Sequence, residues 1–316
     1  CIVGSYIFPF EPFKTTFCFH FSRRPGEPPL EAGWIPFLGV ALDYGRDPLA
    51  FLRETQKKCG DIFTCKIAGK YFTFITDPFS FPAAVRQGKN LDFQKFAIGF
   101  SQRVFGHADF TADVHNGSYK EVHSLFHQTL QGPSLTLLTQ SMLGNLQEVL
   151  RQNLPKGEDW EEEGLQGFSN RIMFDAGFLT LFGQEAGLTA KADDRQAKTD
   201  PYMRKMANDF LVFDRAFPEM AAGLPIHLCV RAWLARESLA EKFLHARLQR
   251  HHSISALIKL RMDAFDRMQL DERGKARTHV CMLWASQANT LPTAFWSFYQ
   301  NPGKVICKRQ KKIFSI

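Results

Sequence analysis

The sequence predicts a mainly helical fold with a small β-sheet near its N-terminal end. Apolar residues recur at helical spacing through most of the chain after Ser118. The clearest strand pattern, an alternation of β-branched and aromatic residues, lies between residues 62 and 75. A chain of 316 residues is long enough to bury a substantial core. We therefore expect helices to form the core and the sheet to be a minor part.

The N-terminal third contains short elements that proline and glycine separate. The expected elements are an extended proline-rich hinge at residues 23–30, a helix at 48–58, a hairpin at 62–75 that turns at Ala68-Gly69-Lys70, and a short helix after Asp77-Pro78. Residues 91–111 are rich in phenylalanine, contain glycine and show no clean period. They predict a long irregular segment, which in folded proteins is often functional.

The pattern of the remaining two thirds of the sequence predicts helices. The expected helices are 134–154, 168–182, 202–217, 230–250 and 254–262, with a last helix that ends near Tyr299. Residues 168–182 are apolar on nearly all sides, so this helix should lie in the interior. A polar surface loop is expected at 184–200, and a break at 218–225.

Charge and cysteine content exclude some classes of protein. The net charge is +7, but part of the excess lies at Arg23-Arg24 and in residues 308–312, with both signs mixed elsewhere. We therefore expect no binding to nucleic acid. The seven cysteines form no Cys-x-x-Cys pair, which predicts reduced, mostly buried thiols rather than a disulfide scaffold.

The first 22 residues are an atypical N-terminal segment. They are rich in aromatic residues, but Pro9, Glu11, Pro12 and Lys14 interrupt them, so they predict neither a membrane-spanning helix nor a secretory signal. The chain also begins with Cys1 rather than methionine, from which we expect it to be a piece of a longer protein.

A group of polar residues interrupts the long apolar run at 279–299. Ser286, Gln287, Asn289 and Thr290 lie together in its middle, and burial of such side chains without partners costs a few kcal/mol. Pro292 follows them and cannot donate to the carbonyl of Ala288, so the helix should kink there. The pattern predicts a notch that holds a ligand or water. The alternative is a polar pair that only caps the kink, because threonine can bond back to an earlier carbonyl.

This segment resembles the distal helix of the cytochrome P-450 haem-thiolate monooxygenases. Thr290 matches the threonine of that helix, while Asn289 stands where an acid is usual and Gln287 where a glycine is usual. These departures resemble the branch that contains the sterol 7α-hydroxylases and prostacyclin synthases. Further stretches of similarity are residues 24–30, 33–39, 69–76, 129–132, 221–227 and 253–258, so the resemblance extends from about Arg23 to Gln300.

The resemblance implies a cytochrome P-450-like fold, helix-rich with a small N-terminal sheet and truncated after the distal helix. Residues 31–300 would be the N-terminal part of that domain, and 301–316 a basic tail unrelated to it. The family implies a haem cofactor, electrons from NADPH through a reductase, a sterol substrate, and a place at the membrane surface on the cytosolic face of the endoplasmic reticulum. Cholesterol and an oxysterol both remain open as substrate, and so does a non-catalytic truncated product.

The resemblance also assigns roles to single residues. Thr290 would handle dioxygen and protons, and Asn289 would form a polar wall of the substrate pocket. Trp284 and Ala285 would form its apolar wall, while Phe93, Phe96 and Leu224 would lie over the pocket and at its mouth. The alternative is that these apolar residues only pack in the core and have no role in binding a substrate.

Other metal-site and motif candidates are weaker. Gly303 to Cys307 resembles the haem-ligand loop, but Gln300 and Arg309 replace its phenylalanine and second glycine, so no metal ligand is expected in this chain. His123 and His127 have the spacing of two metal ligands without a third, and predict a partly solvated basic helix face. Glu148 and Arg151 predict an ordinary surface pair.

Overall fold

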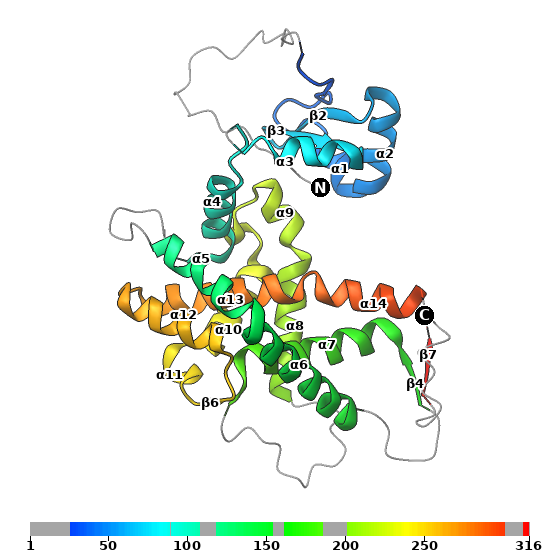
Figure 1. Ribbon diagram of the computed structural model, residues 1–316. Coiled ribbons are helices and arrows are strands. Elements are labelled where there is room, and N and C mark those ends of the chain that lie inside the picture. Colours follow the sequence, from blue (N-terminus) through cyan, green and yellow to red (C-terminus); the bar gives the residue numbers. More distant parts are fainter. Residues whose placement is uncertain are drawn as a thin grey trace. The chain divides into compact units, whose positions relative to one another are not determined.

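The computed structural model describes residues 26–88, 90–107, 118–153, 161–185, 201–300 and 312–315 (Figure 1). The described residues divide into two units. The first contains residues up to Phe100 together with Ala221–Gly223, and the second contains Ser101–Met220 and Leu224–Ile316. The expectations for residues 1–25 and for most of 184–200 and 301–316 lie outside the described residues. Helices dominate and the N-terminal sheet is small, as predicted.

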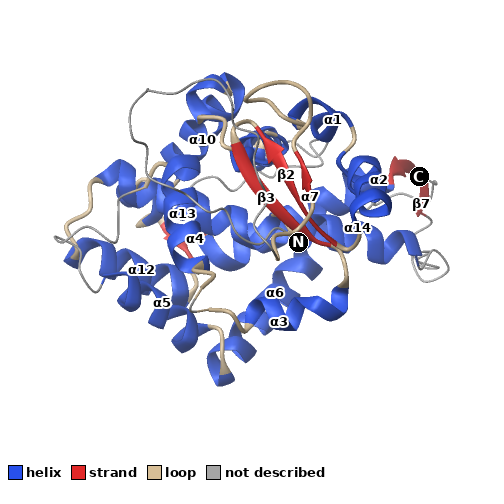
Figure 2. Ribbon diagram, turned by 90° about the horizontal axis from the view of Figure 1, so that it is seen from above, coloured by secondary structure: helices blue, strands red, loops and turns tan. Residues whose placement is uncertain are grey.

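The first unit is built on a three-stranded sheet, shown in red in Figure 2. Strand β1 (Leu30–Glu31) runs parallel to β2 (Ile62–Ile67), which pairs antiparallel with β3 (Lys70–Ile75). The predicted hairpin is confirmed. Its tight turn is formed by Ala68 and Gly69, both with positive φ (48° and 78°), a turn geometry that matches the right-handed twist of the strands.

Two helices cover the core of this sheet. They are α1 (Ala41–Arg46) and α2 (Pro48–Cys59), and they contribute Tyr44, Phe51 and Leu52 to the cluster around buried Phe63 and Phe74. The predicted helix at 48–58 is confirmed. Asp47 caps its start by accepting a hydrogen bond from the backbone N–H of Ala50 at 3.0 Å.

The short helix expected after Asp77-Pro78 is also present. It consists of the 3₁₀ turn η1 (Pro78–Ser80) followed by α3 (Phe81–Val85). Asp77 accepts from the backbone N–H of Phe79 at 3.1 Å.

The expectation of an irregular segment at 91–111 is wrong over most of its described part, because α4 occupies Phe93–Phe105. The rings of Phe96 and Phe100 stack at 5.7 Å, as an i, i+4 aromatic pair on a helix does. Phe93 remains 78% exposed, whereas Val104 and Phe105 are buried. Phe93, Phe96, Ala97, Phe100 and Val104 in fact follow the i, i+3, i+4, i+7 spacing of a helix, so the sequence does contain the signal for α4.

The second unit is almost entirely helical. Its helices are α5 (Ser118–Thr129), α6 (Gly132–Asn153), α7 (Leu165–Phe182), α8 (Pro201–Arg215), α9 (Phe217–Ala222, which ends in the first unit), η3 (Ile226–Leu228), α10 (Val230–Lys242), α11 (His245–Leu248), α12 (Ala256–Arg267), α13 (Glu272–Gln287) and α14 (Thr290–Gln300). Strand β4 (Glu161–Gly164) pairs with β7 (Lys312–Ser315), and β5 (Gln184–Glu185) pairs with β6 (His251–His252).

Several boundaries differ from the sequence expectation, and the helix expected at 254–262 occupies Ala256–Arg267. The break expected at 218–225 begins later, because α9 stays helical to Ala222 and tolerates Pro218 in its first turn, where an N–H has no helical partner. The helix expected at 230–250 divides after Lys242, where Phe243 turns into the core and is fully buried.

Helix α7 is the centre of the second unit, as its all-round apolar pattern predicts. Its rings Phe174, Phe178 and Phe182 follow one another along one side, with centroid distances of 6.5 and 5.3 Å. Phe210 of α8 lies 5.5 Å from Phe174, and Phe243 lies 4.5 Å from Phe182. Helices α6 and α14 pack along it (Figure 1).

Helix α13 begins at a side-chain cap. Asp271 accepts a hydrogen bond from the backbone N–H of Gly274 at 2.8 Å. An added Cβ at Gly274 would lie 2.6 Å from the Asp271 carboxylate, so a larger residue at 274 would require a shift of that side chain. This cap sets the start of the helix that carries the polar notch.

Replacement of Asp271 by alanine should lower the free energy of unfolding of the chain by about 1 kcal/mol, because one N–H of the first turn loses its acceptor. Denaturant unfolding followed by far-ultraviolet circular dichroism measures this. Asp271→Asn keeps an acceptor oxygen and should stay within about 0.5 kcal/mol of the unmutated chain. Equal losses in the two variants would show that the cap is not the source of the effect.

Candidate functional site

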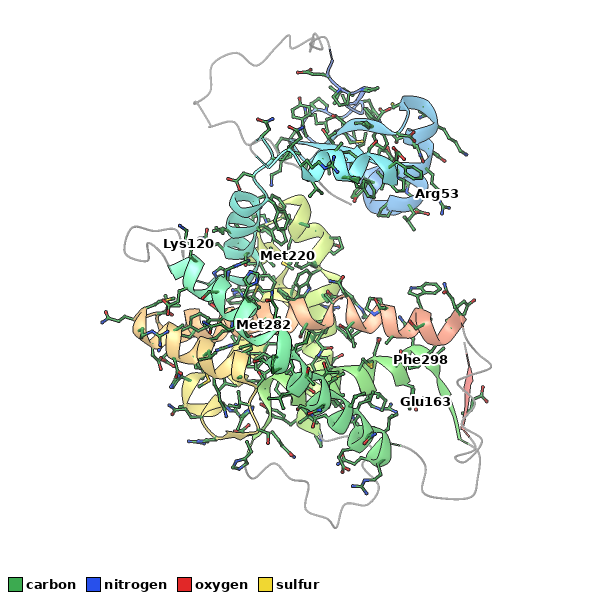
Figure 3. All side chains as sticks on the ribbon, in the orientation of Figure 1. Arg53, Lys120, Glu163, Met220, Met282 and Phe298 are labelled. Carbon is green, nitrogen blue, oxygen red and sulfur yellow. The ribbon has the colours of Figure 1, made fainter. Side chains whose placement is uncertain are left out.

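The residues of the predicted polar notch lie at the junction of α13 and α14. Helix α13 ends at Gln287 and α14 begins at Thr290, so the helix is interrupted one turn before Pro292, as expected. In Figure 3 Met282 marks α13 and Phe298 marks α14 on either side of this break. The interruption leaves Ala288 and Asn289 between the two helices.

The hydroxyl groups of the notch bond to nearby backbone carbonyls. Thr290 donates to the carbonyl of Ser286 at 2.7 Å, and Ser286 donates to that of Leu283 at 2.8 Å. Thr293 donates to the carbonyl of Asn289 at 2.7 Å. The back-bonding that sequence analysis left open for threonine is thus present. The Thr290 oxygen keeps acceptor capacity in this arrangement.

Gln287 is part of the notch in sequence but is buried against α7. It is 1% exposed, and its amide nitrogen lies 3.5 Å from the carbonyl of Phe174. An added Cβ at Gly177 would lie 2.5 Å from that nitrogen, so glycine at 177 gives the side chain its space. The Gln287 carbonyl oxygen is buried and has no partner among the described residues.

Asn289 and Ala285 lie on a different side of the helices from Gln287. Both are exposed, four residues apart, and Thr290 beside them is half-buried. Thr293 and Trp296 continue the exposed surface onto α14, Trp296 being 53% exposed. We call Ala285, Asn289, Thr293 and Trp296 the notch face. It combines one amide with a largely apolar surface.

Trp284 is held away from solvent on several sides. Its indole N–H donates to a carboxylate oxygen of Asp214 on α8 at 2.8 Å. Its ring stacks on Phe217 with centroids 3.9 Å apart and planes at 13°, and Phe105 lies at 5.8 Å. Burial raises the pKa of the Asp214 carboxyl. Sequence analysis missed Asp214, since nothing local in the sequence links it to Trp284.

The remaining predicted site residues, Leu224, Phe93 and Phe96, lie in other segments of the chain. Leu224 is 43% exposed, and its backbone N–H donates to the carbonyl of Glu219 at 3.0 Å. Phe93 and Phe96 belong to the first unit, whereas the notch belongs to the second. Helices α13 and α14, with the break between them, form what we call the helical rod. Four of the predicted site residues, Trp284, Ala285, Asn289 and Thr290, lie on this rod.

The weaker candidates behave as ordinary surface groups. The rings of His123 and His127 lie 5.1 Å apart, and His127 bonds to the Gln131 amide at 3.0 Å. Within the described part of the chain, no group of three histidine, cysteine or acidic residues is placed to hold a metal ion. Glu148 and Arg151 form an exposed ion pair on α6.

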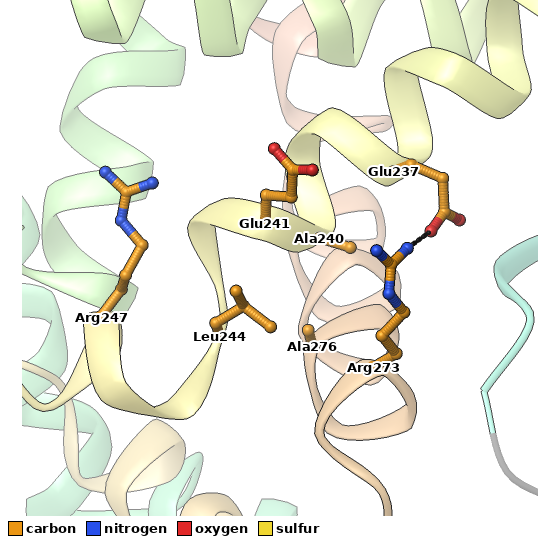
Figure 4. A pocket seen from close by; sticks show the side chains of 7 residues that line it. All are labelled: Glu237, Ala240, Glu241, Leu244, Arg247, Arg273 and Ala276. Atoms are coloured by element: carbon orange, nitrogen blue, oxygen red, sulfur yellow. Dashed lines mark hydrogen bonds and ion pairs between the residues drawn. The ribbon is translucent and has the colours of Figure 1, made fainter.

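A separate hollow of about 270 Å³ lies between α10, α11 and α13. Its lining residues, shown in Figure 4, are Glu237, Ala240, Glu241, Leu244, Arg247, Arg273 and Ala276. Ala276 lies roughly 20 Å before Thr290 along the helical rod, so the hollow is not part of the notch.

The carboxylate of Glu237 at this hollow is shared by three arginines. Arg236, Arg273 and Arg277 lie 2.7, 2.9 and 3.0 Å from its oxygens. Arg236 and Arg277 also donate to the carbonyls of Val104 and Gly106. We infer that Glu237 and these three arginines form a structural clamp that joins α10 to α13.

Residues 28–300 match the cytochrome P450 family along most of the chain. The chain belongs to the cytochrome P450 family. It is 46% identical over 279 residues to "Cytochrome P450 7A1" of Oryctolagus cuniculus and 45% identical over 283 residues to "Cholesterol 7-alpha-monooxygenase" of Cricetulus griseus. It is 35% identical over 282 residues to "Prostacyclin synthase" of Homo sapiens. These matches cover 87–88% of this chain, which spans about half the length of the curated relatives (54%).

Family membership confirms the predicted fold and branch, and it implies a haem-thiolate cofactor. A thiolate ligand requires a cysteine with an accessible, ionisable thiol. Burial instead raises the pKa of Cys65 to about 12, and it also raises the pKa of Cys229 and of Cys281. Cys59 packs against the sheet core of the first unit. None of the described cysteines is fully exposed, so none offers the open thiol that an axial haem ligand requires.

Replacement of Glu237 by glutamine should lower the free energy of unfolding at pH 7 by about 1–2 kcal/mol, because three arginines lose a shared anion that is partly solvated. The arginine hydrogen bonds hold the folded pKa of Glu237 below its ordinary value of 4.5, although burial opposes them. Its stabilisation is therefore present above that value and is lost as pH falls through the folded pKa.

The difference in the free energy of unfolding between Glu237→Gln and the unmutated chain should accordingly shrink as the pH falls below 4.5. Chemical denaturation at a series of pH values measures it. Glu241→Gln is the matched control, because Glu241 lines the same hollow but forms no ion pair with the described residues. A difference that stays constant with pH would contradict the clamp.

Proposed function

We propose that this chain is the substrate- and oxygen-handling part of a sterol monooxygenase that hydroxylates cholesterol at the 7α position. The observation that supports this most is the break between α13 and α14, which leaves an exposed amide, Asn289, beside the Thr290 hydroxyl. The similarity to the Cricetulus griseus protein named "Cholesterol 7-alpha-monooxygenase" supports the reaction and the substrate. NADPH, through a reductase, is the proposed electron source.

Thr290 is the proposed proton-handling group. Its hydroxyl proton is held by the Ser286 carbonyl at 2.7 Å, and its oxygen can accept a hydrogen bond at the same time. A turn of the side-chain hydroxyl exchanges one acceptor for another without moving the backbone. Haem, when bound, supplies the oxygen chemistry, and the protein supplies orientation and proton control.

Asn289 is the proposed contact to the polar end of the sterol. Its side-chain amide makes no hydrogen bond with the described residues, and it is exposed on the notch face. An amide both donates and accepts, so it can pair with a sterol hydroxyl whichever way that group points. Ala285 and Trp284, about one helical turn earlier, supply the apolar contact.

A membrane surface on the cytosolic face of the endoplasmic reticulum is the proposed location. In the described part of the chain, no helix combines the length and apolar character that crossing a bilayer requires. Apolar side chains are instead exposed around the start of α10, namely Leu228 (62%), Val230 (55%), Trp233 (40%) and Leu234 (56%). Such a cluster suits shallow contact with lipid, the phase in which a sterol dissolves.

A chimera tests the proposed function. Residues 28–300 of this chain replace the matching segment of the Cricetulus griseus relative, and the product of cholesterol turnover is identified. We expect haem uptake and a 7α-hydroxylated product. A chimera that takes up haem but forms no such product contradicts the proposal, and so does one that cannot take up haem, because the segment then cannot complete the fold.

Three variants of this chimera should separate the roles of the two notch residues. Thr290→Val should reduce product per NADPH consumed by about tenfold and leave sterol affinity within about twofold, while Thr290→Ser keeps the hydroxyl and the coupling. Asn289→Leu should weaken sterol binding by about tenfold, because the sterol hydroxyl loses its partner. If both variants bind and turn over cholesterol like the chimera, the notch only caps the kink.

Contact with lipid is tested by flotation of the chain with phosphatidylcholine vesicles. Leu234→Glu should reduce the bound fraction by about fivefold, because a charge replaces an apolar side chain at the proposed contact. Leu143→Glu on α6 is the control, since Leu143 is equally exposed (54%) but lies elsewhere. Equal losses in the two variants would mean that binding is a non-specific property of exposed leucines.

A further inference from the structure

The indole of Trp284 is fixed in direction as well as in place. Phe217 lies flat against it at 3.9 Å, and Phe105 approaches at 5.8 Å. Stacking alone lets one ring slide over another, whereas a hydrogen bond is directional. The 2.8 Å bond from the indole N–H to Asp214 therefore sets the rotation of the ring. The side chain is still only half-buried, so part of the indole remains open.

The half-buried carboxylate of Asp214 lowers the stability of the fold and accepts a single hydrogen bond from the described side chains. It is half-buried and forms no ion pair with the described residues, and its one described hydrogen bond is the one from Trp284. Burial raises the pKa of its carboxyl. A carboxylate without a cation in such a place costs free energy of folding, so an apolar residue would serve packing better. The acceptor oxygen is what distinguishes Asp214 from an apolar residue.

We propose that Asp214 is a positioning residue that fixes the open edge of Trp284 as a rigid wall against the fused rings of the sterol. The neighbouring Ala285 is small and exposed, so it leaves room for a rigid ligand to reach this wall. A flat, rigid ring system gains most from a surface that does not rotate, because no side-chain freedom is lost on binding. This inference rests on the proposed sterol function.

The test uses the chimera described above with four single variants and one double variant. Asp214→Leu removes the acceptor at similar size, Asp214→Asn keeps a neutral acceptor, and Trp284→Phe removes the donor. Asp209→Leu is the matched control on the same helix, because Asp209 pairs with Lys205 and Ser238 instead. The indole N–H band in ultraviolet resonance Raman difference spectra reports the hydrogen bond, and the cholesterol dissociation constant reports the wall.

We expect Asp214→Leu to lose the hydrogen-bonded indole band and to weaken cholesterol binding by about tenfold, as a lost charge-assisted hydrogen bond would. Asp214→Asn should keep the hydrogen-bonded indole band and a cholesterol dissociation constant within about twofold of that of the unmutated chimera. Asp209→Leu should do the same. In the Trp284→Phe background, Asp214→Leu should have no further effect, because phenylalanine has no N–H to position.

Three results would overturn the inference. Asp214→Leu could lose the band yet bind cholesterol like the unmutated chimera, or it could weaken binding equally with and without Trp284. An unshifted indole band in Asp214→Leu would refute the hydrogen bond itself. Failure of the proposed function gives a different result, because the unmutated chimera would then bind no sterol while the Raman comparison still reports the Asp214 bond.

Discussion

The close approach of α13 to α7 is the constraint on which the rest of the second unit depends. Gln287, the last residue of α13, is buried against Gly177 and the carbonyl of Phe174, and no side chain larger than hydrogen fits at Gly177 without a shift. The helix is therefore fixed at the point where it stops. The next residues, Ala288 and Asn289, form the break, and the notch face is oriented by a contact on the other side of the rod.

Local chemistry made much of the fold predictable. Asp47-Pro48 and Asp77-Pro78 combine a capping side chain with a proline that suits a first helical turn, and both mark helix starts. The alternation around Ala68-Gly69 likewise specifies a hairpin with a tight turn. Helix α4 was missed although Phe93, Phe96, Phe100 and Val104 follow helical spacing, because Gly99 and Gly106 favoured an irregular segment.

The features of the site that depend on neighbouring residues in the sequence were predictable. The features that depend on tertiary contacts were not. Pro292 and the adjacent hydroxyls specify a break in the helix from covalent structure alone, and the break lies where they place it. The partners of Trp284 come from α8, α9 and α4, and Asp214 is seventy positions away in sequence. A carboxylate in an amphipathic helix carries no mark of the indole it will meet. Roles for Asn289 and Thr290 remain proposals because they concern a ligand.

The two halves of the helical rod differ in how firmly they are held. Helix α13 buries residues along its whole length, from Gly274 to Gln287, whereas α14 buries Leu291 among its described side chains. With the backbone ladder interrupted between them, α14 can open without disturbing α13. Exchange of its amide protons with water is then governed by local opening, and the notch lies at the boundary between a slowly exchanging segment and a rapidly exchanging one.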